Sequence, residues 1–224
     1  MSELSNDEIR TEGRRRRRFT PVVLLSGVAA TALLSLTLTG TLAGFTAQIT
    51  NSTNTAATGT VVMQEQNATA TVTCTSTDLG SISTNASTCS TINKYGGSTV
   101  MVPGTPVSTT VTIKNVGTAP ANTFTLTPGT CTQSNNGALN GSALDLCTKL
   151  GVVITQTVSG TTTTITPVNS TLTSLASGGA LTLTAPVAAG ATVSFTFTVT
   201  LASAAGNTYQ GLAASQPLVW QFSS

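Results

Sequence analysis

Side chains able to do acid-base or metal chemistry are few in this chain and widely spaced. The sequence has no histidine, so neither a Ser-His-Asp triad nor a Cys-His pair can be formed from it. After residue 18 its only carboxylates are Glu65, Asp78 and Asp145, and a paired-carboxylate hydrolase would need two of them to meet. They fall in separate stretches of the chain. We therefore expect no enzymatic activity and no cofactor.

The four cysteines are the other reactive side chains. Cys74 and Cys89 flank one Ser/Thr-rich loop, and Cys131 and Cys147 flank another. Four cysteines permit three pairings, and spacing alone does not prove one. We expect the two local pairs, each worth about 3 kcal/mol for a loop of about 15 residues. A four-cysteine metal site is disfavoured because the sequence has no CxxC spacing and no histidine, so the cysteines indicate an oxidising compartment outside the cytoplasm.

The N-terminal region has the layout of an export signal. Residues 1–18 form a basic leader that ends in five consecutive arginines, and residues 19–43 follow without any ionisable side chain. A basic cluster before an apolar run is typical of a signal segment held on the cytoplasmic side by its arginines. The alternative, a nucleic-acid patch, is disfavoured because only three lysines and no arginine follow. We expect no nucleic-acid partner.

Length does not decide whether the apolar segment is cleaved, because at roughly 20 residues per crossing it is long enough to be a retained anchor. We therefore predict cleavage from the chemistry of the segment. Thr41 and Ala43 are small residues at the minus-three and minus-one positions that a signal peptidase prefers. We expect cleavage after Ala43, with Gly44 as the mature N-terminus. The protein would then contact the membrane only as a precursor. Retention of residues 19–43 as a tether is the alternative.

The exported part has the pattern of short antiparallel strands. It is rich in Thr, Ser, Val and Gly, and turn sequences such as YGG, PGTP and NNG divide it. Three segments alternate apolar and polar residues with the period of a half-buried strand. The residues that we expect to face the core are Val107, Val111 and Ile113 in the first segment, Val193, Phe195, Phe197 and Val199 in the second, and Trp220 in the third.

We expect residues 60–224 to form one all-β domain, an antiparallel jelly-roll-like β-sandwich. The exported part, about 180 residues from Gly44 onward, can bury enough surface for a single two-sheet core. A hairpin is predicted to turn at Ser159 and Gly160, and residues 141–151 are the only segment of the body that permits a helix. Lysines are scarce on the Thr-coated strands, so strand edges are poorly protected against pairing with a partner.

Three motifs, in order along the chain, resemble the TasA and camelysin family of secreted fibre-forming proteins, whose precursors are cut by a dedicated type I signal peptidase. The first, GTLAGFTAQITNSTNTAATGTVVM, resembles the end of the family's signal peptide and its first strand. The second, PGTPVSTTVTIKNVGTAPA, is similar to its Pro-Gly turn, strand and Asn-x-Gly turn. The third, AGNTYQGLAASQPLVWQF, matches its Asn-x-Tyr-Gln-Gly element and aromatic last strand; the motif residues are Asn207, Tyr209, Gln210 and Gly211.

The chain departs from the family pattern in its cysteines, its low charge and its longer basic leader. The family name has also been attached to metallopeptidase activity. Because this sequence has no HExxH motif and no histidine, we do not carry that activity over.

The resemblance implies a sandwich that polymerises when the freed N-terminal segment of one subunit joins the sheet of the next subunit as a strand. Residues 44–59 would be this donor strand and its linker, with Phe45, Ala47 and Ile49 on one face. Burying the Phe and Ile side chains contributes about 3 to 6 kcal/mol per junction before association costs. The alternative is that they fold back into their own domain. We expect the acceptor on the apolar faces of the strands at residues 107–113 or 193–201.

A head-to-tail contact of this kind does not close, so it propagates as a filament. We therefore expect a secreted structural subunit of an extracellular fibre, in a biofilm matrix or at a cell surface, whose partners are further copies of itself and a signal peptidase. The alternative function is a membrane-tethered, monomeric adhesion or ligand-binding module.

Overall fold

The computed structural model describes residues 47–97 and 100–224. The predicted cleavage residues Thr41, Ala43 and Gly44, and the predicted donor residue Phe45, lie outside this range. The chain divides into a unit that ends at Thr55 and a compact unit from Ala56 to Ser224, to which all the strands belong. No helix formed by the described residues is long and apolar enough to cross a membrane.

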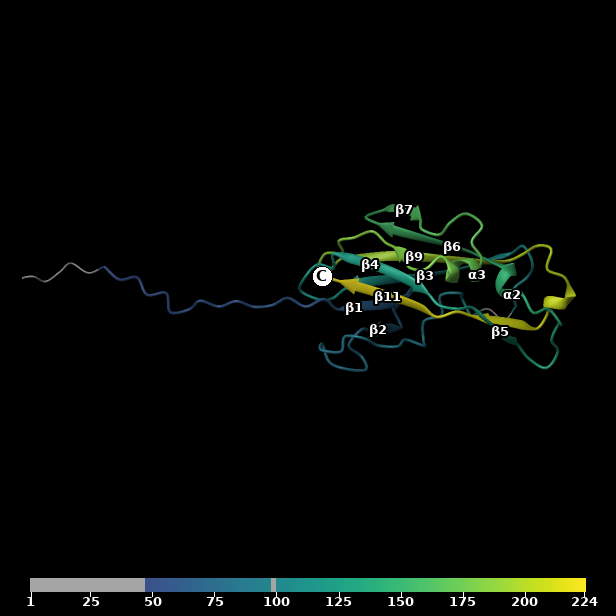
Figure 1. Cartoon of the computed structure of the whole chain (residues 1–224), viewed down its shortest axis with the longest axis horizontal. Helices are drawn as coiled ribbons and strands as arrows, with labels where there is room; N and C mark the ends of the chain where they lie inside the picture. Colours follow the sequence, from purple (N-terminus) through teal and green to yellow (C-terminus); the bar gives the residue numbers. More distant parts are fainter. Residues whose placement is uncertain (1–46, 98–99) are drawn as a thin grey trace, which may run out of the picture. The chain divides into compact units, whose positions relative to one another are not determined.

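Antiparallel sheets make up the compact unit (Figure 1). The strands are β1 (Met63–Asn67), β2 (Thr73–Thr75), β3 (Pro106–Asn115), β4 (Thr123–Pro128), β5 (Thr132–Asn135), β6 (Leu150–Val158), β7 (Thr161–Thr164), β8 (Leu181–Thr182), β9 (Thr192–Leu201), β10 (Leu212–Ser215) and β11 (Leu218–Ser223). The largest sheet has the order β2-β1-β3-β9-β6-β7, a second has the order β11-β4-β8, and β10 pairs with β5. The prediction of an all-β antiparallel sandwich is confirmed, whereas its jelly-roll connectivity stays a prediction.

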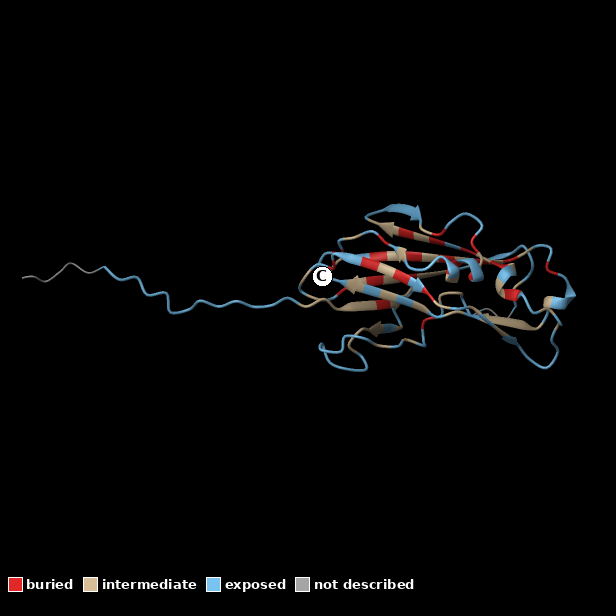
Figure 2. Ribbon diagram, in the orientation of Figure 1, coloured by how far each residue is buried: buried red, intermediate tan, exposed pale blue. Residues whose placement is uncertain are grey.

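The core lies between the sheets and uses the apolar faces that alternation predicts. Figure 2 shows buried and less buried residues alternating along the central strands. The buried residues include Val111 and Ile113 of β3 and Val193, Phe195, Phe197 and Val199 of β9. Phe195 contacts two aromatic rings of the opposite sheet, Phe124 at 5.6 Å and Trp220 at 4.6 Å between ring centroids. Val107 and Trp220 are only half-buried, because Val107 lies near the start of β3 and Trp220 lies on an edge strand.

The short helices agree only partly with prediction. Helix α2 (Leu146–Lys149) lies within the segment that permits a helix. Helix α3 (Leu172–Ser177) was not expected, so the prediction of a single helical segment is wrong. Its first turn is closed by a capping box between Thr171 and Ser174, and its two leucines are buried. The usual signal for such a box is a Glu or Gln at the third position, which this sequence lacks.

The disulfides and the hairpin turn agree with the predictions from the sequence. The disulfides join Cys74 to Cys89 and Cys131 to Cys147, which are the two local pairs. The hairpin between β6 and β7 turns where predicted, with positive φ angles of 49° at Ser159 and 82° at Gly160, as a two-residue hairpin turn with the matching twist requires.

The chain enters β1 through a fixed point at the Asn-x-Gly turn after β3. The Val116 and Thr118 amides donate hydrogen bonds to the carbonyls of Val62 and Thr60, each at 2.8 Å. Asn115 is fully buried, and its side-chain amide donates to two carbonyls of neighbouring segments. A Cβ at Gly117 would collide with the Thr60 carbonyl. The N-terminal segment therefore leaves the sandwich from a rigid point at residue 60.

Replacing Gly117 with Ala should lower the free energy of unfolding by about 1 to 3 kcal/mol, the usual cost of forcing an extra methyl group into a packed site. Urea unfolding followed by circular dichroism measures this loss. Gly206→Ala is the control, because a Cβ there meets no atom within 4 Å. Equal stability of the two variants would show that the turn does not hold the chain at residue 60.

Candidate functional site

A cleft of about 1790 Å³ follows β10 and β11 along their whole length. Residues 212–224 form one wall, and residues of β1, β2 and the loop after β2 form the other. Val199 and Leu201 of β9 also line it. Pockets for small ligands usually measure about 300 to 1,000 Å³. The volume and the strand that lines it suit a segment of polypeptide better than a small molecule.

Strand β11 pairs with β4 on one side and has no described strand on its other side. All six residues of β11 are in register with β4, and the Gly129 amide donates to the Pro217 carbonyl at 2.8 Å. Because hydrogen-bonded and non-bonded positions alternate in an antiparallel pair, the backbone N–H and C=O groups of Leu218, Trp220 and Phe222 point away from β4. No hydrogen bond joins these backbone groups to another described residue. Within the described chain, β11 is the longest strand with one unpaired side.

The same three residues point their side chains inward. Leu218, Trp220 and Phe222 are half-buried and pack against the core, whereas Val219 between them is 58% exposed. A strand added to this edge would complete a hydrogen-bond ladder. The apolar residues on one of its faces would then lie beside these three side chains.

The two strands on which we expected the acceptor differ in how fully their edges are paired. β9 is paired on both sides, with β3 and β6. β3 lies between β1 and β9, but β1 pairs only with residues 111–115 of β3, so residues 106–110 have no described strand on that side. The expected acceptor at residues 107–113 or 193–201 stays a prediction. Their apolar residues serve the core, and Val199 reaches the cleft. Two residues of the predicted core and acceptor set lie on strand edges without a described neighbour: Trp220 on β11, and Val107 on the part of β3 that β1 does not reach. Alternation shows which face a strand buries, but not which strands flank it.

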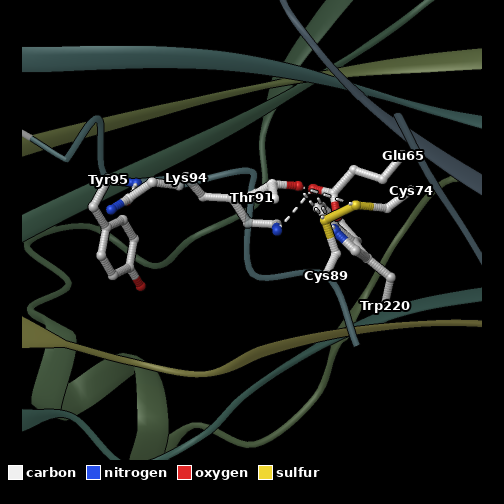
Figure 3. Close-up of polar contacts among 8 residues, drawn as sticks. Glu65, Cys74, Cys89, Thr91, Lys94, Tyr95 and Trp220 are labelled. Carbon is white, nitrogen blue, oxygen red and sulfur yellow. Dashed lines mark hydrogen bonds and ion pairs between the residues drawn. A yellow bond between two sulfur atoms is a disulfide. The ribbon is translucent and has the colours of Figure 1, made fainter. Parts of the chain in front are cut away.

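A buried ion pair lines the cleft. The Lys94 ammonium is 2.7 Å from Glu65 Oε1, and the two side chains are 10% and 8% exposed. The indole N–H of Trp220 donates to the same carboxylate oxygen at 3.3 Å, so both donors converge on Glu65 (Figure 3). No other charged residue of the described chain lines this cleft. Since a buried charge needs its partner, the pair holds β1, the loop and β11 in one arrangement.

The loop that carries Lys94 is fixed at two further points. The Cys74–Cys89 disulfide joins it to β2, and the Thr91 hydroxyl lies 3.6 Å from both sulfur atoms (Figure 3). The Tyr95 hydroxyl donates to Gln216 Oε1 at 2.6 Å. Gln216 lies between β10 and β11, and its amide donates to the carbonyls of Gly129 and Leu172. No local sequence pattern indicates that Glu65 meets Lys94 or that Tyr95 meets Gln216, because the residues of each pair lie far apart along the chain.

Burial raises the pKa of Tyr95 above its usual value of 10.0. The folded state therefore favours the neutral phenol of Tyr95. Below pH 10 this group leaves the free energy of unfolding unchanged. Above pH 10 the Tyr95 hydroxyl loses its proton in the unfolded chain before it does so in the folded chain, so the free energy of unfolding falls. The slope of the free energy of unfolding against pH reaches about 1.4 kcal/mol per pH unit for one group. Tyr95→Phe should remove this slope and cost about 1 kcal/mol at pH 8, because the hydrogen bond to Gln216 is lost.

Urea unfolding between pH 8 and pH 11 measures both effects of Tyr95→Phe. Tyr209→Phe is the control: the pKa of Tyr209 is also raised, but first by its hydrogen bond to Asp145 and only second by burial, whereas burial is the main cause for Tyr95. We expect a smaller change of slope in this variant. The same alkaline slope in Tyr95→Phe and the unaltered protein would contradict the assignment.

The Asn-x-Tyr-Gln-Gly element lies immediately before β10. Asn207 to Tyr209 form a short 3-10 helix (η1), and the Tyr209 hydroxyl donates to Asp145 at 2.7 Å. This hydrogen bond is the main reason that the pKa of Asp145 is lowered. Gly211 has a φ of +65°, and a Cβ there would collide with the Leu139 carbonyl. Gln210 lies between Tyr209 and Gly211. The whole element thus holds the loop closed by the Cys131–Cys147 disulfide against β10.

The three carboxylates of the body have separate partners. Glu65 accepts from Lys94 and Trp220, Asp145 accepts from Tyr209, and Asp78 accepts from the backbone amide of Thr75 at 2.6 Å.

Of the predicted donor residues, Ala47 and Ile49 lie in a stretch, residues 47–62, that forms neither helix nor strand. Ile49 is 98% exposed.

No protein-family model matches this chain, and no curated protein matches it. The resemblance to TasA and camelysin proteins therefore depends on the three motifs alone. The structure gives two of them a physical role: the Asn-x-Gly turn fixes the chain at residue 60, and the aromatic last strand is β11.

Proposed function

We propose that this protein is a secreted structural subunit of an extracellular fibre, and that residues 44–50 of one mature subunit add as a strand beside β11 of the next. The observation that carries the proposal is the outer edge of β11, which has no partner strand among the described residues and lines a cleft. Three apolar side chains of β11 face inward beside this edge. The two disulfides favour a location outside the cytoplasm.

The lengths of the two segments are compatible. Six residues of β11 extend over about 20 Å, and residues 44–50 would extend over about 24 Å at the usual rise of a strand. The nine residues from 51 to 59 can span about 30 Å. A donor segment that leaves its own sandwich at residue 60 can therefore reach a neighbouring subunit.

Two terms favour insertion of the donor segment. Its backbone would pair the free N–H and C=O groups of three β11 residues, and each such hydrogen bond contributes about 0.5 to 1.5 kcal/mol net. Burial of Phe45 and Ile49 would contribute about 3 to 6 kcal/mol more. Each subunit has one donor and one acceptor, so the contact repeats as an open filament.

Electron microscopy of the purified mature chain, residues 44–224, tests the proposal. We expect filaments one subunit wide, and mass spectrometry of the exported protein should show a chain beginning at Gly44. Monomers at high protein concentration would contradict the proposal.

A second candidate is a membrane-tethered module that binds a ligand in the same cleft. The observation in its favour is the polar centre made by Glu65, Lys94 and the Trp220 indole, since binding sites combine apolar walls with a few placed polar groups. An exported protein that retains residues 19–43 and stays monomeric would support this reading against the fibre.

A further inference from the structure

We infer that Trp220 sets the register of the incoming strand, with Ala47 of the donor directly beside Trp220 and with Phe45 and Ile49 on either side of it. This inference rests on the proposed function and identifies which donor residue meets which acceptor residue. It assigns the partner surface as residues 45–49 of a second copy of this chain.

Donor and acceptor have the same spacing. Leu218, Trp220 and Phe222 recur every second residue on the inner face of β11, and Phe45, Ala47 and Ile49 recur every second residue in the donor. Directly opposed side chains on one face of paired strands have Cβ atoms about 5 Å apart. Three registers keep the apolar faces together: the donor residue beside Trp220 can be Phe45, Ala47 or Ile49.

Packing around the Trp220 indole distinguishes these registers. Its ring centroid lies 4.6 Å from that of Phe195, 5.7 Å from that of Phe124 and 6.2 Å from that of Phe197. Its N–H is held by Glu65 at 3.3 Å. The indole therefore cannot turn aside without breaking a hydrogen bond to a buried carboxylate. A small neighbour fits beside a large fixed ring, and Ala47 is the smallest of the three donor residues.

The alternative registers place a large side chain against the fixed indole. Phe or Ile in that position would overpack the site, at a typical cost of about 1 to 3 kcal/mol. With Ala47 central, Phe45 and Ile49 lie beside the smaller Leu218 and the terminal Phe222, whichever direction the donor runs. The Glu65–Lys94 pair then remains closed.

Trp220 is the only tryptophan in the chain, so its fluorescence reports directly on the site. The receptor is a mature chain that begins at Asn51, which removes the donor and leaves the compact unit from Ala56 onward intact. A synthetic peptide of residues 44–55 is the probe. We expect binding to shift Trp220 emission to shorter wavelength, because the strand shields the indole from water.

Peptide variants test the register. Ala47→Phe should weaken binding by about 5- to 150-fold, which corresponds to the overpacking cost of about 1 to 3 kcal/mol. Thr46→Phe is the matched control, because it adds the same ring on the outward face of the donor, and we expect its affinity to stay within about twofold. Equal affinity of the two variants would overturn the register.

Cross-linking gives a second readout that does not depend on affinity. Val219→Cys and Gln221→Cys introduce thiols on the outward face of β11. With Ala47 beside Trp220, peptides with Thr46→Cys and Gln48→Cys should each cross-link to one of these positions. Peptides with Gly44→Cys or Thr50→Cys should cross-link to neither, and disulfides from these two peptides would show a register shifted by two residues.

The outcomes separate this inference from the proposed function. A peptide that binds and cross-links from position 44 or 50 overturns the register but keeps the donor strand. No binding by any peptide, together with no filaments from the intact mature chain, overturns both.

Discussion

A mature chain with Phe45→Asp and Ile49→Asp is expected to remain a folded monomer and to form no filaments. The two apolar side chains supply most of the junction energy, about 3 to 6 kcal/mol. Their loss corresponds to at least a 100-fold rise in the protein concentration that filaments need, at about 1.4 kcal/mol per tenfold. The two new carboxylates would also have to be buried, which adds to the effect. Sedimentation and electron microscopy over a series of protein concentrations measure it.

The matched control is Thr46→Asp with Gln48→Asp, which adds the same charge to the opposite face of the same segment. A strand has two faces that alternate by residue, so this variant should keep its filaments. Deletion of residues 44–50 should behave like the first variant. Filaments of undiminished length in the Phe45→Asp, Ile49→Asp protein, or their loss in both double variants, would show that the face containing Ala47 is not the one that binds.

Replacing Lys94 with Met should lower the free energy of unfolding by about 3 to 5 kcal/mol, because it leaves the Glu65 carboxylate buried without its counter-charge. A domain of this kind is stable by only about 5 to 15 kcal/mol, so the variant should unfold at a much lower urea concentration. Lys149→Met is the control. Lys149 lies 3.5 Å from Asp145, but the two side chains are 40% and 49% exposed, and exposed pairs contribute about 0 to 1 kcal/mol.

A double variant separates loss of the ion pair from loss of packing. Lys94→Met together with Glu65→Leu removes both charges, and replacing a buried pair by apolar residues is often neutral or stabilising. We expect the double variant to regain most of the stability lost in Lys94→Met. If the double variant is as unstable as the single one, the unpaired carboxylate is not the cause.

Features that depend on neighbouring residues could be predicted from the sequence. Alternation in β3 and β9 identified their buried faces, since successive side chains of a strand point to opposite sides whatever lies next to it. The turn at Ser159 and Gly160 and the two local disulfides follow from short separations along the chain. Helix α3 is the exception among local features, because its capping box uses Ser174 in place of an acidic residue or Gln.

Features that depend on distant residues were decided by the tertiary structure. β3 and β9 have the strongest alternation, yet β9 is paired on both sides and β3 is paired on both sides over residues 111–115, whereas β11 has a neighbour on one side only among the described strands. Glu65 and Lys94 meet across a loop, and Trp220 reaches them from the far end of the chain. The backbone period of two dictates which face of a strand is apolar. Which strand has an open edge depends on the order of all the strands, and no local pattern encodes that order.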